Sequence, residues 1–152
     1  MSDEAYEHLA DLLDALPALQ EKGAMLARAR WADRVAQLAD ERETCASLLE
    51  SADDRLRQAE ERLARAEGVD EAARDDARRA VLHAAALRGF RIAPRQNADR
   101  ALQDALAASP FDTVADARSA RMEPERRQAL EAEIAAYQRD YACTLAKCEQ
   151  GE

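Results

Sequence analysis

The sequence has few of the residues that build a β-sheet or a large globular core. Aromatic residues make up 4% of the 152 residues, and Trp31 is the only tryptophan. β-branched residues are too scarce to favour a sheet. About half of the hydrophobic 47% is alanine, which buries little area at roughly 25 cal/mol per Å². A compact globule with a large core is therefore not expected.

Cysteine is scarce, and a leader and long apolar runs are lacking. The three cysteines, Cys45, Cys143 and Cys148, are an odd number without the spacing of a disulfide framework. The acidic N-terminus has no apolar core and does not resemble a signal peptide. No apolar run approaches the roughly 18 residues of a membrane span. These absences predict a cytoplasmic protein that does not enter a membrane.

Sequence motifs typical of enzyme active sites, nucleotide-binding sites and metal sites are missing. The sequence contains no P-loop, GxGxxG, GxSxG, HExxH or CxxC motif. His8 and His83 are far apart in the sequence and lack a neighbouring nucleophile and orienting carboxylate. Cys143 and Cys148 would lie about 140° apart on a helix, so they cannot share one metal ion. We expect no enzyme activity, no cofactor and no metal.

Charge argues against nucleic acid as a direct partner. The chain has 31 acidic and 22 basic residues, a formal net charge of −9. The basic residues are interleaved with acids, whereas a phosphate-binding surface needs clustered Lys and Arg. Direct binding to nucleic acid or to an anionic membrane is not expected.

What the sequence does contain is typical of long helices. Charged residues reach 35%, while Gly and Pro number four each. We predict an all-α fold: a long helical hairpin, or antiparallel coiled coil, with a short broken-helix insertion, which can close into an elongated helical bundle. The chain is expected to form a single elongated unit over residues 1–152.

Helix-breaking residues set the expected boundaries. Pro17 either kinks a continuous helix or begins a new one, which separates residues 1–16 from a long helix over 17–67. Gly68 and the cap Asp70 lead into a returning helix over 70–88. Gly89 is expected to end it. Residues 89–122 then form loop and short helices, and a C-terminal helix spans 123–149.

A heptad repeat gives the strongest signal. With Val35 at an a position, nine of ten a and d positions from Val35 to Ala66 are apolar, and Arg42 is the exception. Alanine at successive d positions favours close antiparallel packing. The C-terminal helix carries a second apolar stripe. Together they predict an interaction seam: Val35, Leu38, Arg42, Cys45, Leu49, Leu56, Leu63, Leu130, Ile134, Tyr137, Tyr141 and Leu145.

One segment resembles a known family. Ser109-Pro110-Phe111-Asp112 leads through Ala117-Arg118 into Glu125-Arg126-Arg127 and on to Ile134-Ala135-Ala136-Tyr137. This phrase is similar to the returning coiled-coil arm of the SbcC-type ATPase subunit of SMC-like exonucleases, over roughly residues 80–149. The resemblance implies a coil that is interrupted and resumed. Walker motifs and the CxxC zinc hook of those subunits have no counterpart here, so the resemblance implies no catalytic residues.

Two functions follow as hypotheses. The first is a non-catalytic coiled-coil structural or oligomerisation segment, from or related to an SMC-like DNA-repair nuclease subunit, that associates with a protein partner or with itself as a homodimer. The alternative is a compact helical-bundle adaptor or regulator that binds a partner helix.

Overall fold

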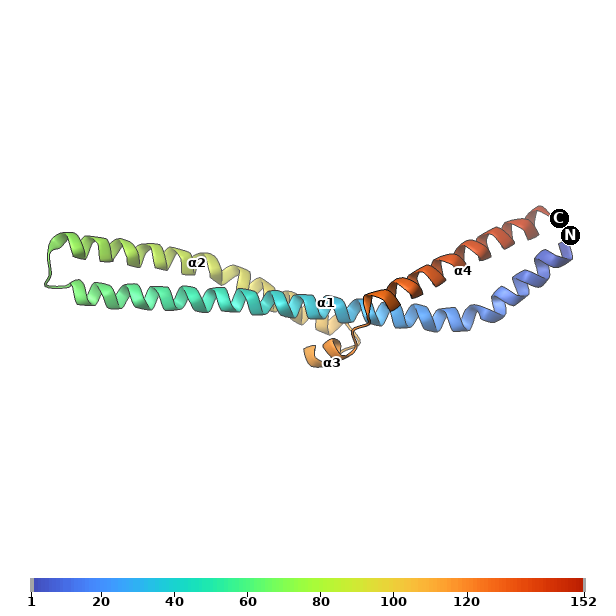
Figure 1. Cartoon of the computed structure of the whole chain (residues 1–152), viewed down its shortest axis with the longest axis horizontal. Coiled ribbons are helices and arrows are strands. Elements are labelled where there is room, and N and C mark those ends of the chain that lie inside the picture. The colour runs from blue at the N-terminus through green and yellow to red at the C-terminus, as the bar shows by residue number, and fades with distance from the viewer. Residues whose placement is uncertain (1, 152) are drawn as a thin grey trace. The chain divides into compact units, whose positions relative to one another are not determined.

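The computed structural model describes residues 2–151, without the side chain of Ser2, and their regular structure is entirely α-helical (Figure 1). The predicted all-α class is therefore confirmed. The chain divides into two compact units: unit 1 combines Met1–Asp33 with Ala115–Glu152, and unit 2 is Arg34–Val114. These units share α1, because the first helix pairs with different helices along its length. The helices are α1 (Ser2–Ala66), α2 (Glu71–Ala108), α3 (Val114–Ser119) and α4 (Pro124–Gln150).

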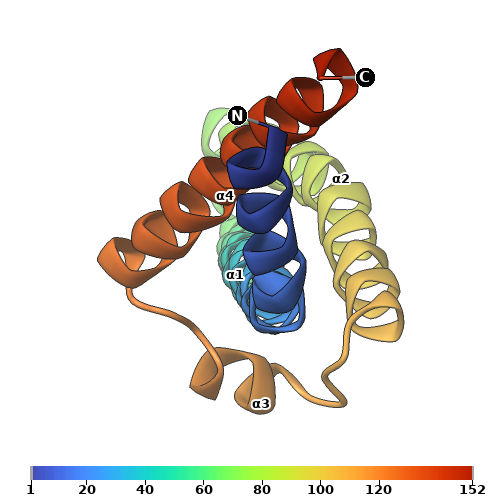
Figure 2. The ribbon, with the colours of Figure 1, turned by 90° about the vertical axis from the view of Figure 1, so that its right-hand side faces the viewer.

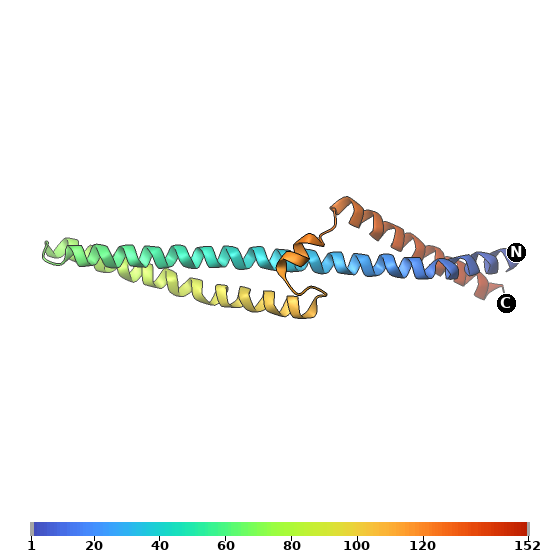
Figure 3. The same cartoon turned by 90° about the horizontal axis from the view of Figure 1, so that it is seen from below.

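Unit 2 is an antiparallel helical hairpin, in which α2 runs back beside the second half of α1 (Figures 1 and 3). Gly68 at the turn has a φ of +92°, a left-handed conformation that side chains disfavour. Asp70 then caps α2 by accepting a 2.7 Å hydrogen bond from the Ala73 amide. Both roles, predicted from the sequence, are confirmed.

The heptad of α1 faces α2 inside this hairpin. Its nine apolar a and d positions from Val35 to Ala66 are all buried or half-buried. Val35 and Leu38 are buried, and Ala52 and Ala59 are buried at d positions. Small side chains at these places let the two helices approach closely, which suits the antiparallel arrangement.

The expected break at Gly89 was wrong, because α2 continues through Gly89 and Pro94 to Ala108. Its inward positions keep a 4-3 spacing throughout: Ala77, Val81, Ala84, Arg88, Arg91, Arg95, Ala98, Leu102 and Ala105, all buried or half-buried. Glycine and proline disfavour a helix interior by about 1 and 3 kcal/mol. Packing against α1 offsets these penalties. Arginines at three successive inward positions hide this repeat in the sequence.

Unit 1 pairs the first half of α1 with α4 (Figure 1). No helix boundary falls at Pro17, which lies inside α1, so the separation of residues 1–16 from 17–67 was wrong. The bend of α1 in its blue N-terminal part, which holds Pro17, fits the kink alternative (Figure 1). Leu12 and Leu26 are buried on the α1 side.

The seam of α4 also follows a 4-3 spacing. Its inward side chains are Leu130, Ile134, Tyr137, Tyr141, Thr144 and Cys148. Leu145, predicted in this seam, is instead 36% exposed. The spacing explains the error, because three residues after Tyr141 is Thr144, which is buried. Pro124 occupies the first turn of α4, as predicted, and Glu123 before it makes no side-chain cap.

Irregular stretches flank α3, which has six residues (Figure 2). Phe111, before α3, is buried in unit 2, and Ala117, within α3, is buried in unit 1. The short helices expected over 89–122 therefore reduce to this one. No helix within residues 2–151 is both long and apolar enough to cross a membrane.

Candidate interaction surfaces

Most of the predicted seam is occupied within the chain. On α1, Val35, Leu38, Cys45, Leu49, Leu56 and Leu63 are buried or half-buried in unit 2. On α4, Leu130 is buried, and Ile134, Tyr137 and Tyr141 are half-buried in unit 1. The rings of Tyr137 and Tyr141 stack with centroids 6.3 Å apart. A partner chain must therefore use other surfaces unless these helix pairs open.

Arg42, the polar residue of the heptad, lies at the edge of the seam. Its side chain is about half exposed, and its Nε donates a 2.6 Å hydrogen bond to Asp99 on α2. Arg95, four residues before Asp99, pairs with the same carboxylate at 3.1 Å. The hydrogen bond from Arg42 is the largest cause that lowers the pKa of Asp99, and Arg95 adds to it. Arg42 thus joins α1 to α2 and does not pack in the seam.

A second cross-helix pair joins Arg88 of α2 to Asp53 of α1. Arg88, Arg91 and Arg95 all lie at inward positions and are half-buried. Their long side chains can cover apolar surface while the guanidinium groups reach the edge of the hairpin.

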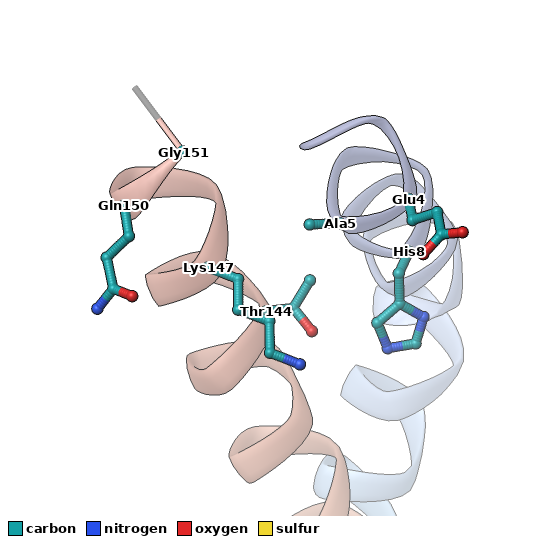
Figure 4. A pocket seen from close by; sticks show the side chains of 7 residues that line it. All are labelled: Glu4, Ala5, His8, Thr144, Lys147, Gln150 and Gly151. Atoms are coloured by element: carbon teal, nitrogen blue, oxygen red, sulfur yellow. The ribbon is translucent and has the colours of Figure 1, made fainter. Parts of the chain in front are cut away.

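Unit 1 contains the only cluster within the described residues that is similar to a catalytic arrangement. His8 Nε2 lies 3.0 Å from both carboxylate oxygens of Asp140, and Thr144 Oγ1 donates to Oδ1 of Asp140 at 3.4 Å. Figure 4 shows the adjoining cavity of about 540 Å³, lined from α1 by Glu4, Ala5 and His8 and from α4 by Thr144, Lys147, Gln150 and Gly151.

The hydrogen bonds do not activate a nucleophile. A catalytic hydroxyl must donate to the imidazole, whereas here the hydroxyl and the imidazole both contact the carboxylate. Thr144 is also buried. The cluster therefore links the two helices and is not arranged for acyl transfer.

The described residues also offer no metal centre. No group of three or more His, Cys, Asp or Glu side chains within residues 2–151 could hold a metal ion. Cys143 is exposed and Cys148 is buried, as expected for residues on different sides of one helix. Cys45 is half-buried in the α1 seam.

One face of unit 2 has a groove of about 590 Å³ between α1 and α2. Its floor includes Ala59 and Ala84, which are buried. Arg55 and Arg62 line it from α1, and His83 lines it from α2. Neither arginine pairs with a carboxylate among the described residues. The complete lining is Arg55, Gln58, Ala59, Arg62, Ala80, His83, Ala84 and Leu87.

The part of α2 beside this groove is basic and exposes large apolar side chains. From Ala77 to Ala98 the sequence has five arginines and no acidic residue. Leu82 and Phe90 are 69% and 78% exposed. Phe90 lies seven residues after His83, so it continues the same side of the helix. Leu82 lies on nearly the opposite side of α2 from the groove-lining residues. We therefore call Phe90 and the groove lining the basic face.

The N-terminal part of α1 has the opposite character. Residues 3–21 contain six acidic residues and no lysine or arginine. Tyr6 and Leu13 are 45% and 47% exposed. Exposed apolar residues recur at Tyr6, Ala10, Leu13 and Pro17, a 4-3-4 spacing that places them along one stripe. Asp3, Glu7 and Asp14 are exposed along one edge of that stripe, and together these residues form the acidic face.

Neither face was predicted from the sequence. The net charge of −9 is a sum over the whole chain, so it does not reveal that residues 77–98 lack acidic residues and residues 3–21 lack lysine and arginine. A charge count over windows of about 20 residues reveals both. Exposure of the apolar side chains was not predictable, because Leu82, Phe90, Tyr6 and Leu13 are of the types that fill seams.

Comparisons with models of protein families, with curated proteins and with solved structures find no match for this chain.

Proposed function

We propose that the protein is a non-catalytic coiled-coil element that acts through contacts with other proteins, as a segment or relative of the arm of an SMC-like nuclease subunit. The observation that carries the proposal is the antiparallel pairing of α1 with α2 inside one chain, in which the nine apolar a and d positions of the heptad are buried or half-buried. An arm that folds back on itself needs this arrangement.

The interruption of the coil supports the family link. Helix α2 ends at Ala108 and α4 begins at Pro124, so the break falls on the residues that carry the resemblance. The absence of enzyme activity is supported by the hydrogen bonds of His8 and Thr144, which leave no activated nucleophile.

Co-purification from the source cells tests this proposal. The tagged full chain is recovered, and the eluate is assayed for ATP-dependent exonuclease activity on duplex DNA. We expect activity in this eluate and none in the recombinant chain alone. An eluate without such nuclease activity contradicts the proposed relation to an SMC-like nuclease. Nuclease or ATPase activity of the pure recombinant chain contradicts the non-catalytic role.

The groove of unit 2 favours a second candidate function, an adaptor that binds a partner helix. Apolar alanines on its floor and unpaired Arg55 and Arg62 at its side suit an amphipathic helix with acidic residues. For an adaptor, Arg55→Glu with Arg62→Glu releases a bound partner from the recovered complex, while Arg126→Glu, an exposed arginine of α4, does not. Retention of the partner by the double variant excludes this use of the groove.

A further inference from the structure

We propose that the protein self-associates head to tail, with the acidic face of one copy bound to the basic face of a second copy. This inference deepens the proposed role as a protein-contact element and rests on it. The two surfaces that meet in this contact are the exposed stripe around Leu13 on α1 of one copy and the exposed surface around Phe90 on α2 of the other copy.

Charge complementarity points to a second copy as the occupant. The acidic face lies in a segment with six acids and no lysine or arginine. The basic face carries Arg55 and Arg62, which pair with no carboxylate among the described residues. Like faces therefore repel, whereas unlike faces attract.

Apolar matching supports the same pairing. Each face exposes a large apolar side chain: Leu13 on the acidic face, with the half-exposed Tyr6 beside it, and Phe90 on the basic face. The acidic face presents its apolar side chains on a helix with a 4-3-4 spacing, as a helix docked in a groove does. The groove beside Phe90 supplies a floor of small residues, and Arg55 and Arg62 lie where they can meet acidic neighbours of Leu13.

A contact between different surfaces is heterologous. In a pair, one copy uses its acidic face and keeps its basic face free, and the second copy uses its basic face and keeps its acidic face free. This property distinguishes the proposal from a symmetric dimer, in which both copies use the same surface. It also allows a complementation experiment with two defective variants.

The experiment compares self-association of the full chain by sedimentation equilibrium, from roughly 10 to 200 µM protein in about 50 mM NaCl. Leu13→Glu removes the apolar contact of the acidic face, and Phe90→Glu places a charge on the basic face. Each variant is expected to weaken association about 10- to 100-fold. Both side chains are exposed and glutamate favours helices, so circular dichroism should show unchanged helicity.

The decisive step mixes the two variants. Leu13→Glu retains the basic face and Phe90→Glu retains the acidic face, so the mixture should form a 1:1 complex with about the affinity of a single wild-type contact. Val69→Glu is the matched control, because Val69 is exposed at the turn outside both faces, and it should associate like the wild type. Raising NaCl to about 0.5 M should weaken association of the wild type.

Several results overturn the proposal: a wild type that stays monomeric, a mixture that does not associate, or a loss in Phe90→Glu without a loss in Leu13→Glu. A loss in Val69→Glu as large as in Phe90→Glu also overturns it. The co-purification assay has a separate readout, so a monomeric chain that recovers nuclease activity refutes head-to-tail association and leaves the proposed function intact.

Discussion

The two helix pairs share α1 but hold it by different means. In unit 2, buried alanines alternate with leucines along α1, and arginine–aspartate pairs bridge the edges of the hairpin. In unit 1, the hydroxyl of Tyr137 donates a 2.5 Å hydrogen bond to the Leu12 carbonyl, and that of Tyr6 donates to the Cys148 carbonyl at 3.4 Å. Small residues thus support one pair, and larger side chains support the other.

Ion pairs differ between the units as well. Asp33 of unit 1 accepts from both Arg121, at 3.0 Å, and Arg127, while Lys22 pairs with Glu133. Most of these groups are substantially exposed. Exposed pairs contribute about 0–1 kcal/mol each. Packing, more than pairing of charges, therefore stabilises both units.

The largest effect is expected from a charge in the alanine seam of unit 2. Ala52→Glu places a carboxylate at a buried d position and should lower the free energy of unfolding by about 3 kcal/mol or more. Urea unfolding followed by circular dichroism measures it. Ala64→Glu, an exposed position on the same helix, is the control and should change stability by less than about 0.5 kcal/mol.

Two substitutions that each create a cavity, one in each unit, compare the stability of the units directly. Leu26→Ala in unit 1 and Leu102→Ala in unit 2 remove side chains that are each 5% exposed. Each should cost about 2–4 kcal/mol. Hydrogen exchange should then show lost protection in α4 for Leu26→Ala and in α2 for Leu102→Ala. Equal loss in both helices for either variant would mean that the units unfold together.

Substitution of two glycines inside helices should raise the stability of the protein. A Cβ added at Gly23 in unit 1 or Gly89 in unit 2 meets no atom within 4 Å. Gly23→Ala and Gly89→Ala should therefore each stabilise the protein by about 1 kcal/mol. Thermal unfolding at low protein concentration measures both, and a decrease in Tm would reveal a contact at that position that the chain alone does not make.

The tyrosine contacts of unit 1 are expected to contribute less. Tyr137→Phe removes the hydroxyl that donates to the Leu12 carbonyl and should lower the free energy of unfolding by about 0.5–1.5 kcal/mol. Tyr141→Phe is the control, because the Tyr141 hydroxyl makes no hydrogen bond among the described residues. A similar loss in the control would assign the effect to ring packing.

Asp99 in unit 2 gives the smallest effect, visible in its titration. Its pKa is lowered from the ordinary 3.8, chiefly by the hydrogen bond from Arg42. A carboxyl whose folded pKa is depressed contributes stability above its unfolded pKa, and this contribution is lost as pH falls through the folded pKa. NMR titration should find the low value, and Arg42→Gln should raise it toward 3.8. An unchanged pKa in Arg42→Gln would show that Arg95 alone holds the carboxylate.

Regular apolar spacing was the part of the fold that could be predicted. The nine apolar heptad positions from Val35 to Ala66 all face the hairpin seam, because a 3.5-residue period has few alternatives. The turn at Gly68 and the cap at Asp70 follow from local chemistry. The continuation of α2 through Gly89 and Pro94 could not be predicted, because it depends on tertiary packing and on arginines that lie at inward positions.

The sequence also did not predict which helix pairs with each half of α1. Both α2 and α4 have seams with a 4-3 spacing, so periodicity alone does not tell which half of α1 each one covers. For the same reason Leu145 was placed in the seam in place of Thr144. The exposed apolar residues of the two faces were missed because spacing identifies a stripe but not whether anything covers it.

The contact between Tyr6 and Cys148 also has a topological consequence. The described chain enters and leaves unit 1 at neighbouring points, since the start of α1 and the end of α4 touch there. A short linker could join these points, and new termini could open at the exposed turn of Gly68 and Val69. Such a circularly permuted chain would keep every helix pair while changing the order in which the two pairs are synthesised.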